Sequence, residues 1–422
     1  MATEGDRVAV KDRVGGAARA AKLDEVGKAW RRLPQRGRSL GVAVVLLGLL
    51  ALYPLYVESL PTGVPVIREF PSVNSMVTVI LFTMMAVGLN IVVGYAGLLD
   101  LGYVAFYAVG AYTAGWLASG QFQQVNFHLG SVGISRDTAG IHISIWLVIL
   151  IAGLVTMVAG ILIGLPTLRL RGDYLAIVTL GFGEIIPQFV RNADNLGGFD
   201  LTHGTFGISP IDSPGFGQSL SDALGLPVSF QQSFDKQNLF FWSALALLLI
   251  TVFCSIRLRD SRLGRAWIAI REDETAAAAM GVPLMRTKTW SYALGAFFGG
   301  VAGAFVATFN SGAFPSQFFF NISIFLLCMV VLGGMGSVWG VVVAGLILSY
   351  LNQEGLSNIG SWLNANTPLN FEVAKYQFGI YGIIIVLMML FRPVGLIPEG
   401  RRKRELQEGG LATDTLYGER HE

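Results

Sequence analysis

Long apolar runs without charged residues constrain the fold of this 422-residue chain more than any other feature. A helix needs about 20 apolar residues to cross the hydrocarbon layer of a membrane, and shorter helices cross when neighbouring helices shield them. The chain therefore predicts an all-α integral membrane protein with about ten transmembrane helices, interrupted by glycines. The ten runs, the last three of them short, are Leu40–Val57, Asn74–Gly94, Leu101–Ala118, His142–Gly164, Tyr174–Val190, Leu239–Ile256, Thr289–Phe309, Phe318–Leu332, Val338–Leu351 and Gln377–Phe391.

The composition argues against a soluble protein. Hydrophobic residues make up 53% of the chain and charged residues 14%, whereas a typical globular domain has about 25% charged residues. The first 38 residues are polar, and no small-residue cleavage site follows the first apolar run, so that run is expected to stay as an anchor. Cys254 and Cys328 lie inside apolar runs and are interpreted as small buried hydrophobes rather than a disulfide or metal pair.

The distribution of Lys and Arg predicts the orientation, because cytoplasmic loops retain positive charge. With ten spans, 25 of the 30 Lys and Arg residues fall on one face, and both termini are predicted to be cytoplasmic. The expected organisation is a cytoplasmic N-terminal extension (1–39), a permease domain (40–391) with a long extracytoplasmic loop (191–238) and a cytoplasmic coupling loop (257–288), and a cytoplasmic tail (392–422).

The basic N-terminal extension is interpreted as a solvated flank that fixes orientation and contacts anionic lipid, with a protein partner as the alternative. The net charge of +2 gives no reason to expect nucleic acid. No Gly-x-x-x-x-Gly-Lys-Ser/Thr sequence is present, so any ATP must be hydrolysed by a partner. The four histidines lack metal-site spacing, and we predict no catalytic residue, metal or cofactor in this chain.

The segment Gly88–Gly102 places polar residues within an otherwise apolar stretch. Its glycines permit close helix approach or a broken helix, and broken helices expose backbone groups that bind solutes near the membrane midplane. Lining of the translocation pathway and simple packing stay open as alternatives. The pathway candidates in this segment are Asn90, Gly94, Tyr95 and Gly97.

Glu184 is a further pathway candidate, because an ionisable group ten residues into a predicted span is expensive in lipid. Pro187 loosens the helix there by removing one backbone donor. The alternative is that Glu184, which lies only a few residues from the outer end, reaches water or pairs with Arg191.

The loop Ser261–Val282 predicts a short helix for docking on a partner protein. Acidic residues 272–274 are expected in its first turn, four alanines continue it, and Gly281 followed by Pro283 ends it. A small-residue face flanked by charges suits such docking, whereas an amphipathic linker on the lipid surface is the alternative. The candidate coupling residues are Arg265, Arg271, Glu272, Asp273, Glu274, Ala277 and Gly281.

A second glycine-rich connection, Leu332–Gly340, resembles the first in joining two apolar runs with almost no charge. Both connections fall on the predicted cytoplasmic face. The pair hints at an internal repeat of the kind that many transporters contain.

Together these segments resemble the LivM family of permease subunits in high-affinity branched-chain amino-acid ABC importers. The resemblance runs from Met76 to Pro398 and includes Leu168–Glu184, Leu263–Glu274 and the segment Arg392–Pro398. It implies a second, LivH-like permease, two LivG/LivF-like ATPases and an extracytoplasmic solute-binding protein as partners. The loop around Glu272 is then the segment that docks on an ATPase, and no cofactor binds this chain.

The resemblance implies transport of branched-chain or related small amino acids across a bacterial inner membrane, and the protein is not expected to be an enzyme. The family also contains permeases for urea and amides, and an ion-coupled secondary transporter is the alternative from another class. The family pattern Thr-Gly-Gly-x-Asn-Gly-Ile reads here Thr202-His203-Gly204-Thr205-Phe206-Gly207-Ile208, which puts in question how this loop meets the binding protein.

Overall fold

The computed structural model divides the chain into two compact units, residues 1–61 and 62–422. The described part of the first unit contains helix α3 (Tyr53–Ser59). The predicted N-terminal extension, half of the first predicted span (residues 40–47 and 49) and the C-terminal tail beyond residue 397 lie outside the described residues. The structure describes residues 48, 50–59, 71–130, 138–170, 172–215, 233–366, 372–392 and 395–397.

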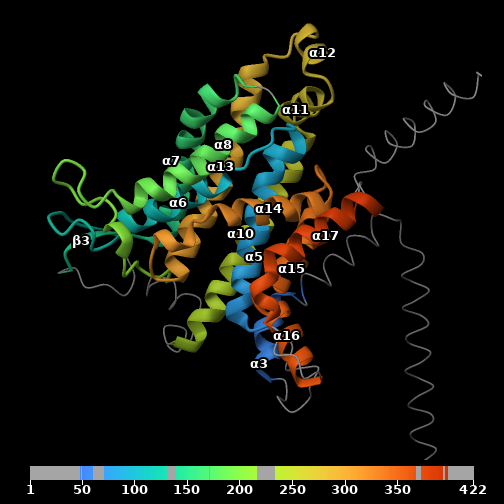
Figure 1. The fold of residues 1–422 in the computed structure, drawn as a ribbon. Coiled ribbons are helices and arrows are strands. Elements are labelled where there is room, and N and C mark those ends of the chain that lie inside the picture. Colours follow the sequence, from blue (N-terminus) through green and yellow to red (C-terminus); the bar gives the residue numbers. More distant parts are fainter. Residues whose placement is uncertain are drawn as a thin grey trace, which may run out of the picture. The chain divides into compact units, whose positions relative to one another are not determined.

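The described part of the second unit is predominantly helical (Figure 1). Two turns in it are wider than an α-helix, namely the π-helical segments η1 and η5, and three others are 3₁₀ turns. The elements in chain order are α5 (Val73–Asn90), η1 (Ile91–Tyr95), α6 (Tyr103–Leu117), α7 (Ile145–Thr167), α8 (Asp173–Arg191), η2 (Gly204–Phe206), α10 (Ser233–Asp260), α11 (Arg262–Glu272), α12 (Glu274–Ala279), α13 (Leu284–Phe309), η4 (Pro315–Gln317), α14 (Phe320–Gly333), α15 (Val338–Tyr350), η5 (Leu351–Gly355), α16 (Leu356–Asn366), η6 (Val373–Tyr376) and α17 (Gln377–Phe391).

The helical membrane fold is confirmed. Among the described residues, six helical segments are long and apolar enough to cross a membrane, and they contain α5, α7, α8, α10, α13 and α14. Helix α6 has 15 residues and is buried on nearly all sides, so neighbouring helices shield it. Helices α15 and α17 are apolar but short, and the total of ten spans stays a prediction.

One predicted span boundary is wrong. The fourth helix begins at Ile145 rather than His142, because Gly140–Ile143 forms strand β3. The helix that holds the ninth run, Val338–Leu351, continues beyond the run through η5 and α16 to Asn366. In this extension Asn352 Oδ1 accepts a hydrogen bond from the Tyr381 hydroxyl at 2.9 Å.

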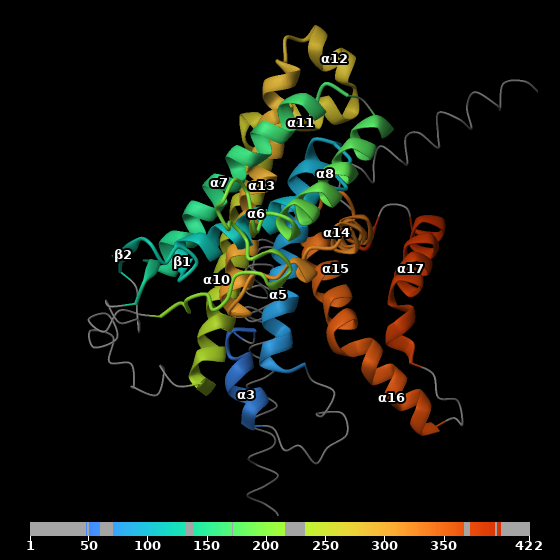
Figure 2. The ribbon, with the colours of Figure 1, turned by 60° about the vertical axis from the view of Figure 1, so that its left-hand side comes forward.

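Helix α13 is the central helix of the second unit and packs along α5, α6 and α7 (Figure 2). Small residues make this possible. A Cβ added at Gly303 would lie 2.1 Å from the Tyr107 carbonyl oxygen of α6, and one at Gly300 would lie 2.2 Å from Thr156 Oγ1 of α7. Backbones therefore approach closely where lipid offers no hydrophobic driving force between helices.

A small sheet lies beside the ends of α6 and α7 (Figure 1). Its strands are β1 (Ala118–Ser119), β2 (Asn126–Leu129) and β3 (Gly140–Ile143), in the order β1-β3-β2. Strand β3 pairs antiparallel with β1 and parallel with β2. Isolated bridges join Ser119 to Ile211 and Ile208 to Ala313, so the loop after α8 is tied to this sheet. The apolar pattern of the sequence does not indicate this sheet.

Candidate functional site

Helix α11 is anchored to the start of α13. Ser261 caps it, with its Oγ accepting from the backbone N–H of Gly264 at 3.2 Å. Trp267 is fully buried, and its indole N–H donates to the carbonyl oxygen of Thr287 at 2.8 Å. A buried indole with its polar atom satisfied fixes the orientation of the helix that carries it.

The predicted coupling helix is two helices rather than one. Helix α11 ends at Glu272, and Asp273 adopts extended backbone (φ −153°, ψ 110°) as the N-cap of α12. The Asp273 carboxylate accepts from the backbone N–H groups of Thr275 at 2.8 Å and Ala276 at 3.0 Å. Placing Glu272 and Asp273 in the first helical turn was therefore wrong, because Asp is strongly favoured as a cap residue. Hydrogen bonds from the N–H groups of Ala276 and Thr275 lower the pKa of Asp273.

An ion pair fixes α12 against α13. Lys288 Nζ lies 2.8 Å from Glu274 Oε1, and the two side chains are 4% and 29% exposed. Ala277 is 5% exposed, so it faces the protein. Glu274 and Ala277, which the sequence singled out for docking, position the helix from its inner side.

Helices α11 and α12 with the residues up to Gly281 make up the predicted coupling segment. Its outer side is formed by the exposed residues Arg265, Glu272, Asp273 and Gly281, together with Met280. Met280 was missed by the sequence analysis, although its side chain is 85% exposed. A single Met after an alanine run gives no sequence signal, and only the direction of α12 reveals it. Helices α11 and α12 project at one end of the second unit (Figures 1 and 2).

The first glycine segment packs against protein. Asn90 is fully buried at the end of α5, and its Oδ1 accepts from the backbone N–H of Gly336 at 2.9 Å. The Tyr95 hydroxyl lies 3.0 Å from Ser255 Oγ. Arg271 donates a hydrogen bond to the carbonyl oxygen of Gly94, and the aliphatic part of its side chain lies beside Gly97. The structure therefore brings Gly94 and Gly97 into contact with α11, whereas Asn90 and Tyr95 pack against Gly336 and Ser255.

Glu184 lies elsewhere, on an exposed face of α8. It lines a shallow hollow with Ile185, Gln188, Phe189 and Asn192. Gln188 and Asn192 follow Glu184 at intervals of four, a spacing that gives one helical face and that the sequence analysis overlooked.

Arg191 does not pair with Glu184 in the described structure. Its guanidinium carbon lies 5.4 Å from the centroid of the Phe319 ring instead. The carboxylate of Glu184 is therefore left for a group outside this chain or for water.

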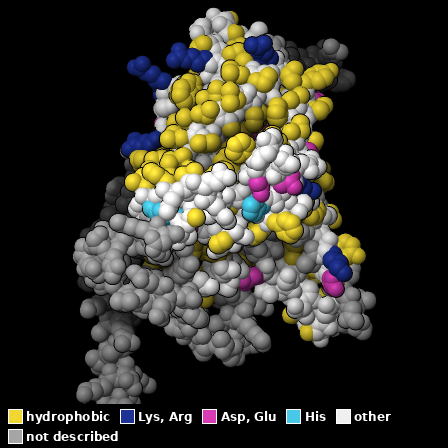
Figure 3. All heavy atoms as spheres, turned by 90° about the vertical axis from the view of Figure 1, so that its left-hand side faces the viewer, with side chains coloured by type: hydrophobic (Ala, Val, Ile, Leu, Met, Phe, Trp, Pro, Cys, Tyr) yellow, Lys and Arg dark blue, Asp and Glu magenta, His cyan; other side chains and the backbone are white. Residues whose placement is uncertain are grey.

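Figure 3 shows a broad band of hydrophobic side chains on one face, with Lys and Arg gathered beyond its upper margin. Helix α7 contributes exposed leucines to the hydrophobic surface of the molecule, among them Leu150, Leu154 and Leu162. Such a surface is suited to lipid. The face of α8 differs from it, because three polar side chains run between exposed Ile and Phe residues. Lipid cannot hydrogen-bond to these groups.

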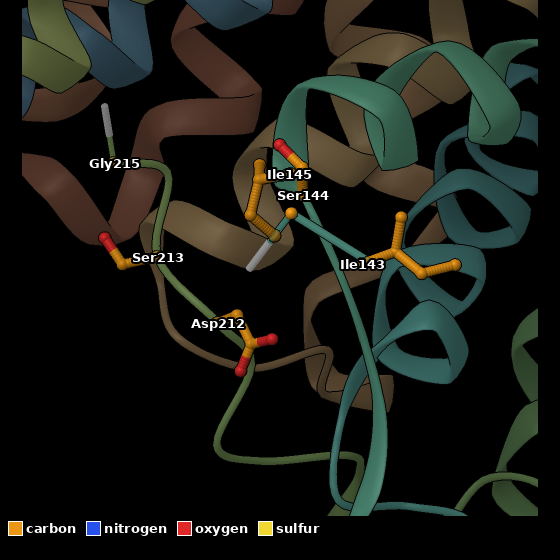
Figure 4. A pocket seen from close by; sticks show the side chains of 7 residues that line it. Ile143, Ser144, Ile145, Asp212, Ser213 and Gly215 are labelled. Carbon is orange, nitrogen blue, oxygen red and sulfur yellow. The ribbon is translucent and has the colours of Figure 1, made fainter. Parts of the chain in front are cut away.

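A small pocket lies where β3 leads into α7, and its lining includes Ser144, Ile145 and Asp212 (Figure 4). The pocket has a volume of about 10 Å³, room for a single water molecule. Behind it, Asp212 Oδ2 lies 2.9 Å from Nδ1 of the buried His142. Burial raises the pKa of Asp212, and the hydrogen bond with His142 opposes this shift. No cluster of three or more His, Cys, Asp and Glu side chains suited to a metal occurs in the part of the chain that the structure describes.

The two residues that depart from the family pattern, His203 and Phe206, lie in the loop after α8, which is paired with the sheet through Ile211. His203 has left-handed backbone (φ 56°), and its Nδ1 contacts Asp200 Oδ2. Phe206 is 83% exposed. The two residues that differ from the resembled family therefore stand on the surface of this loop.

Comparison with known proteins gives a consistent match. Residues 72–390 match the family described as the permease component of the branched-chain amino acid transport system. The chain is 36% identical to the high-affinity branched-chain amino acid transport system permease protein LivM of Salmonella typhimurium over 348 residues. These residues make up 80% of this chain and 72% of that relative. LivM of Escherichia coli is 36% identical over 342 residues, 78% of this chain and 70% of that protein.

A more distant match is the permease protein LivH of Salmonella typhimurium, which is 27% identical over 176 residues, 41% of this chain and 51% of that protein. No solved structure matches the chain.

Proposed function

Because the chain belongs to the family of permease components of branched-chain amino acid transport systems, we propose that it is the membrane-spanning permease subunit of an ATP-driven importer. Its cargo is branched-chain or related small amino acids, and its place is the bacterial inner membrane. The chain is a transport component rather than an enzyme, and ATP is hydrolysed by partner subunits.

The anchored coupling segment is the observation that carries this proposal. Buried Trp267 and the Lys288–Glu274 ion pair fix α11 and α12 from the inside. The opposite side then presents Glu272, Asp273 and the side chain of Met280. A rigid base with an exposed apolar residue beside acidic groups suits docking on another protein, because the apolar side chain fills a pocket and the charges set orientation. We assign this surface to one of two ATPase subunits.

The polar stripe on α8 is assigned to a contact with a second permease subunit that is LivH-like. Glu184, Gln188 and Asn192 share one exposed helix face with Ile185 and Phe189. Polar groups at this depth face a cavity or a partner, since exposure to lipid is costly. A translocation pathway between two permeases would give these polar side chains hydrogen-bonding partners.

The sheet and the loop up to Gly215 form the surface proposed to receive the solute-binding protein on the extracytoplasmic side. The turn after α7, with Arg169, and the α10–α13 connection then lie on the cytoplasmic side, together with both termini. Exposed Phe206 adds a large apolar side chain to this surface at a position where the chain departs from the family pattern.

The test uses single cysteines for cross-linking in membranes that contain the full transporter. Met280→Cys is expected to cross-link to an ATPase subunit. The matched control Phe206→Cys, equally exposed at the proposed outer surface, is expected to give no such product. Loss of ATPase cross-linking at position 280, or equal cross-linking at both positions, contradicts the assignment. Uptake by the purified chain alone in proteoliposomes would instead favour an ion-coupled secondary transporter.

A further inference from the structure

The two glycine-rich connections of the chain touch each other. Asn90 Oδ1, at the end of α5, accepts from the backbone N–H of Gly336, which lies between α14 and α15. A Cβ at Gly94 would stand 2.6 Å from the nitrogen of Gly336 and 2.0 Å from Asn90 Oδ1. Glycine at position 94 therefore leaves the room that lets the Asn90 amide reach the second connection.

The first connection, which includes Gly94 and Gly97, also contacts α11 of the coupling segment. Arg271, the penultimate residue of α11, donates to the carbonyl oxygen of Gly94. The aliphatic part of its side chain lies beside Gly97, where the backbone has a φ of +68° and an added Cβ would lie 2.8 Å from Arg271 Cγ. These two contacts join α11 to η1 and to the turn that follows it.

The second connection, Leu332–Gly340, also contacts the last described residues of the chain, 395–397. The backbone N–H of Leu396 donates to the carbonyl oxygen of Leu332 at 2.9 Å. Gly395 packs so closely on Gly334 that an added Cβ would stand 2.4 Å from its Cα. The positive φ angles of Gly334 and Gly336, 104° and 91°, make this a defined turn.

The side-chain amide of Asn90 is only partly hydrogen-bonded, which gives it a physical reason to change its contacts. Its side chain is fully buried, yet Nδ2 has no hydrogen-bond partner. A buried donor without an acceptor is costly, so an arrangement that also satisfies Nδ2 competes with the observed one. The next turn, Ile91–Tyr95, is π-helical, a rare conformation that is frequent at functional sites.

We propose that Asn90 is a positioning residue that transmits movement of the coupling segment from Arg271, through η1, to the connection between α14 and α15. The break after α5 and the break before α15 then move together when the docked ATPase moves α11. This inference rests on the proposed function, because it requires an ATPase at α11 and α12.

The test measures amino-acid uptake per ATP hydrolysed in proteoliposomes that contain the complete transporter and its loaded binding protein. Asn90→Leu, similar in volume but without an acceptor for Gly336, is expected to lower this ratio about tenfold, within the range typical of coupling between sites. Asn90→Asp, which keeps an acceptor oxygen, is expected to restore much of the ratio. Thr83→Val is the matched control, a buried polar position on the same helix that bonds only within α5, and its ratio is expected to stay unchanged.

A second measurement separates transmission from general packing. Arg271→Met keeps the apolar stem beside Gly97 and removes the donor to Gly94. Two residues acting in series give a double variant no worse than the more severe single variant, whereas independent structural roles add. Additive losses, or a normal ratio in Asn90→Leu, overturn the proposal. Absence of ATP-driven uptake in the unmodified transporter would instead refute the proposed function.

Discussion

Helices α13 and α8 are both long enough to cross a membrane, and they relate to the rest of the protein in opposite ways. Helix α13 is buried over most of its length and carries glycines at the points where α6 and α7 approach. Helix α8 is exposed along one face, which includes Ile177, Glu184 and Gln188, and a Cβ at its Gly181 would meet nothing within 4 Å. The first helix is packed within the chain, and the second presents a surface.

The comparison teaches that hydropathy alone does not separate a helix packed inside the chain from one that awaits another subunit. Small residues mark α13 because they let backbones approach. The Glu184 carboxylate and the Gln188 amide, which lie between apolar side chains, mark α8, because neither lipid nor a solely apolar partner would satisfy them. Four predictions test or sharpen this distinction.

The largest effect is expected from glycine replacement. Gly303→Leu forces a side chain into the space next to the Tyr107 carbonyl, which lies only 2.1 Å from the added Cβ position. We expect a loss of about 3 kcal/mol in the free energy of unfolding, or failure to fold. The control, Gly181→Leu on α8, is expected to have an almost unchanged melting temperature in detergent. Equal destabilisation by the two variants would remove the distinction between the helices.

The second largest effect is expected at the start of α13, where Lys288 pairs with Glu274 of α12. Lys288→Met removes the ion pair with Glu274, in which the Lys side chain is 4% exposed. Breaking a buried pair costs about 3–5 kcal/mol, and the partial exposure of Glu274 reduces this to about 2 kcal/mol. We expect faster amide hydrogen exchange in α12 and unchanged exchange in α8. The double variant Lys288→Met/Glu274→Met is expected to recover much of the protection, and no recovery would show that the pair does not hold α12.

A functional effect without loss of stability is expected on α8. Glu184→Gln keeps the size of the side chain and removes its charge, so we expect uptake to fall about tenfold, the value of one hydrogen bond to a charged group. The melting temperature should not change, because the side chain is exposed. Asp173→Asn, an exposed carboxylate at the other end of the same helix, serves as the control and should transport normally. Normal uptake in Glu184→Gln would remove this residue from the pathway.

The smallest effect concerns the cap of α12. The pKa of Asp273 is lowered by the N–H groups of Ala276 and Thr275, so its charged form is favoured in the folded protein. Its contribution is complete above the ordinary Asp value of about 3.9 and is lost as the pH falls through the lowered value. Amide exchange in α12, corrected for intrinsic rates, should therefore be constant between pH 5 and 8. Asp273→Asn, also a good cap, should change it little, and a transition within that pH range would contradict this role.

The sequence by itself determined the membrane-spanning character of the chain, because uncharged apolar runs of this length are stable as helices only in lipid. It also predicted a helical segment between Ser261 and Val282 and singled out Glu184 within its span. These features depend on local composition and spacing, which are readable without knowledge of the fold. Gln188 and Asn192 were equally readable, since both follow Glu184 at helical spacing.

Only the tertiary structure decided which face each local feature presents. The contact between Asn90 and Gly336 joins positions 246 residues apart, and nothing in either segment specifies the other. Glu274, a docking candidate from the sequence, likewise pairs with Lys288 on the inner side of α12. Met280, by contrast, is exposed. The reason is physical: spacing sets which residues share a helix face, but the direction of that face depends on the helices packed against it.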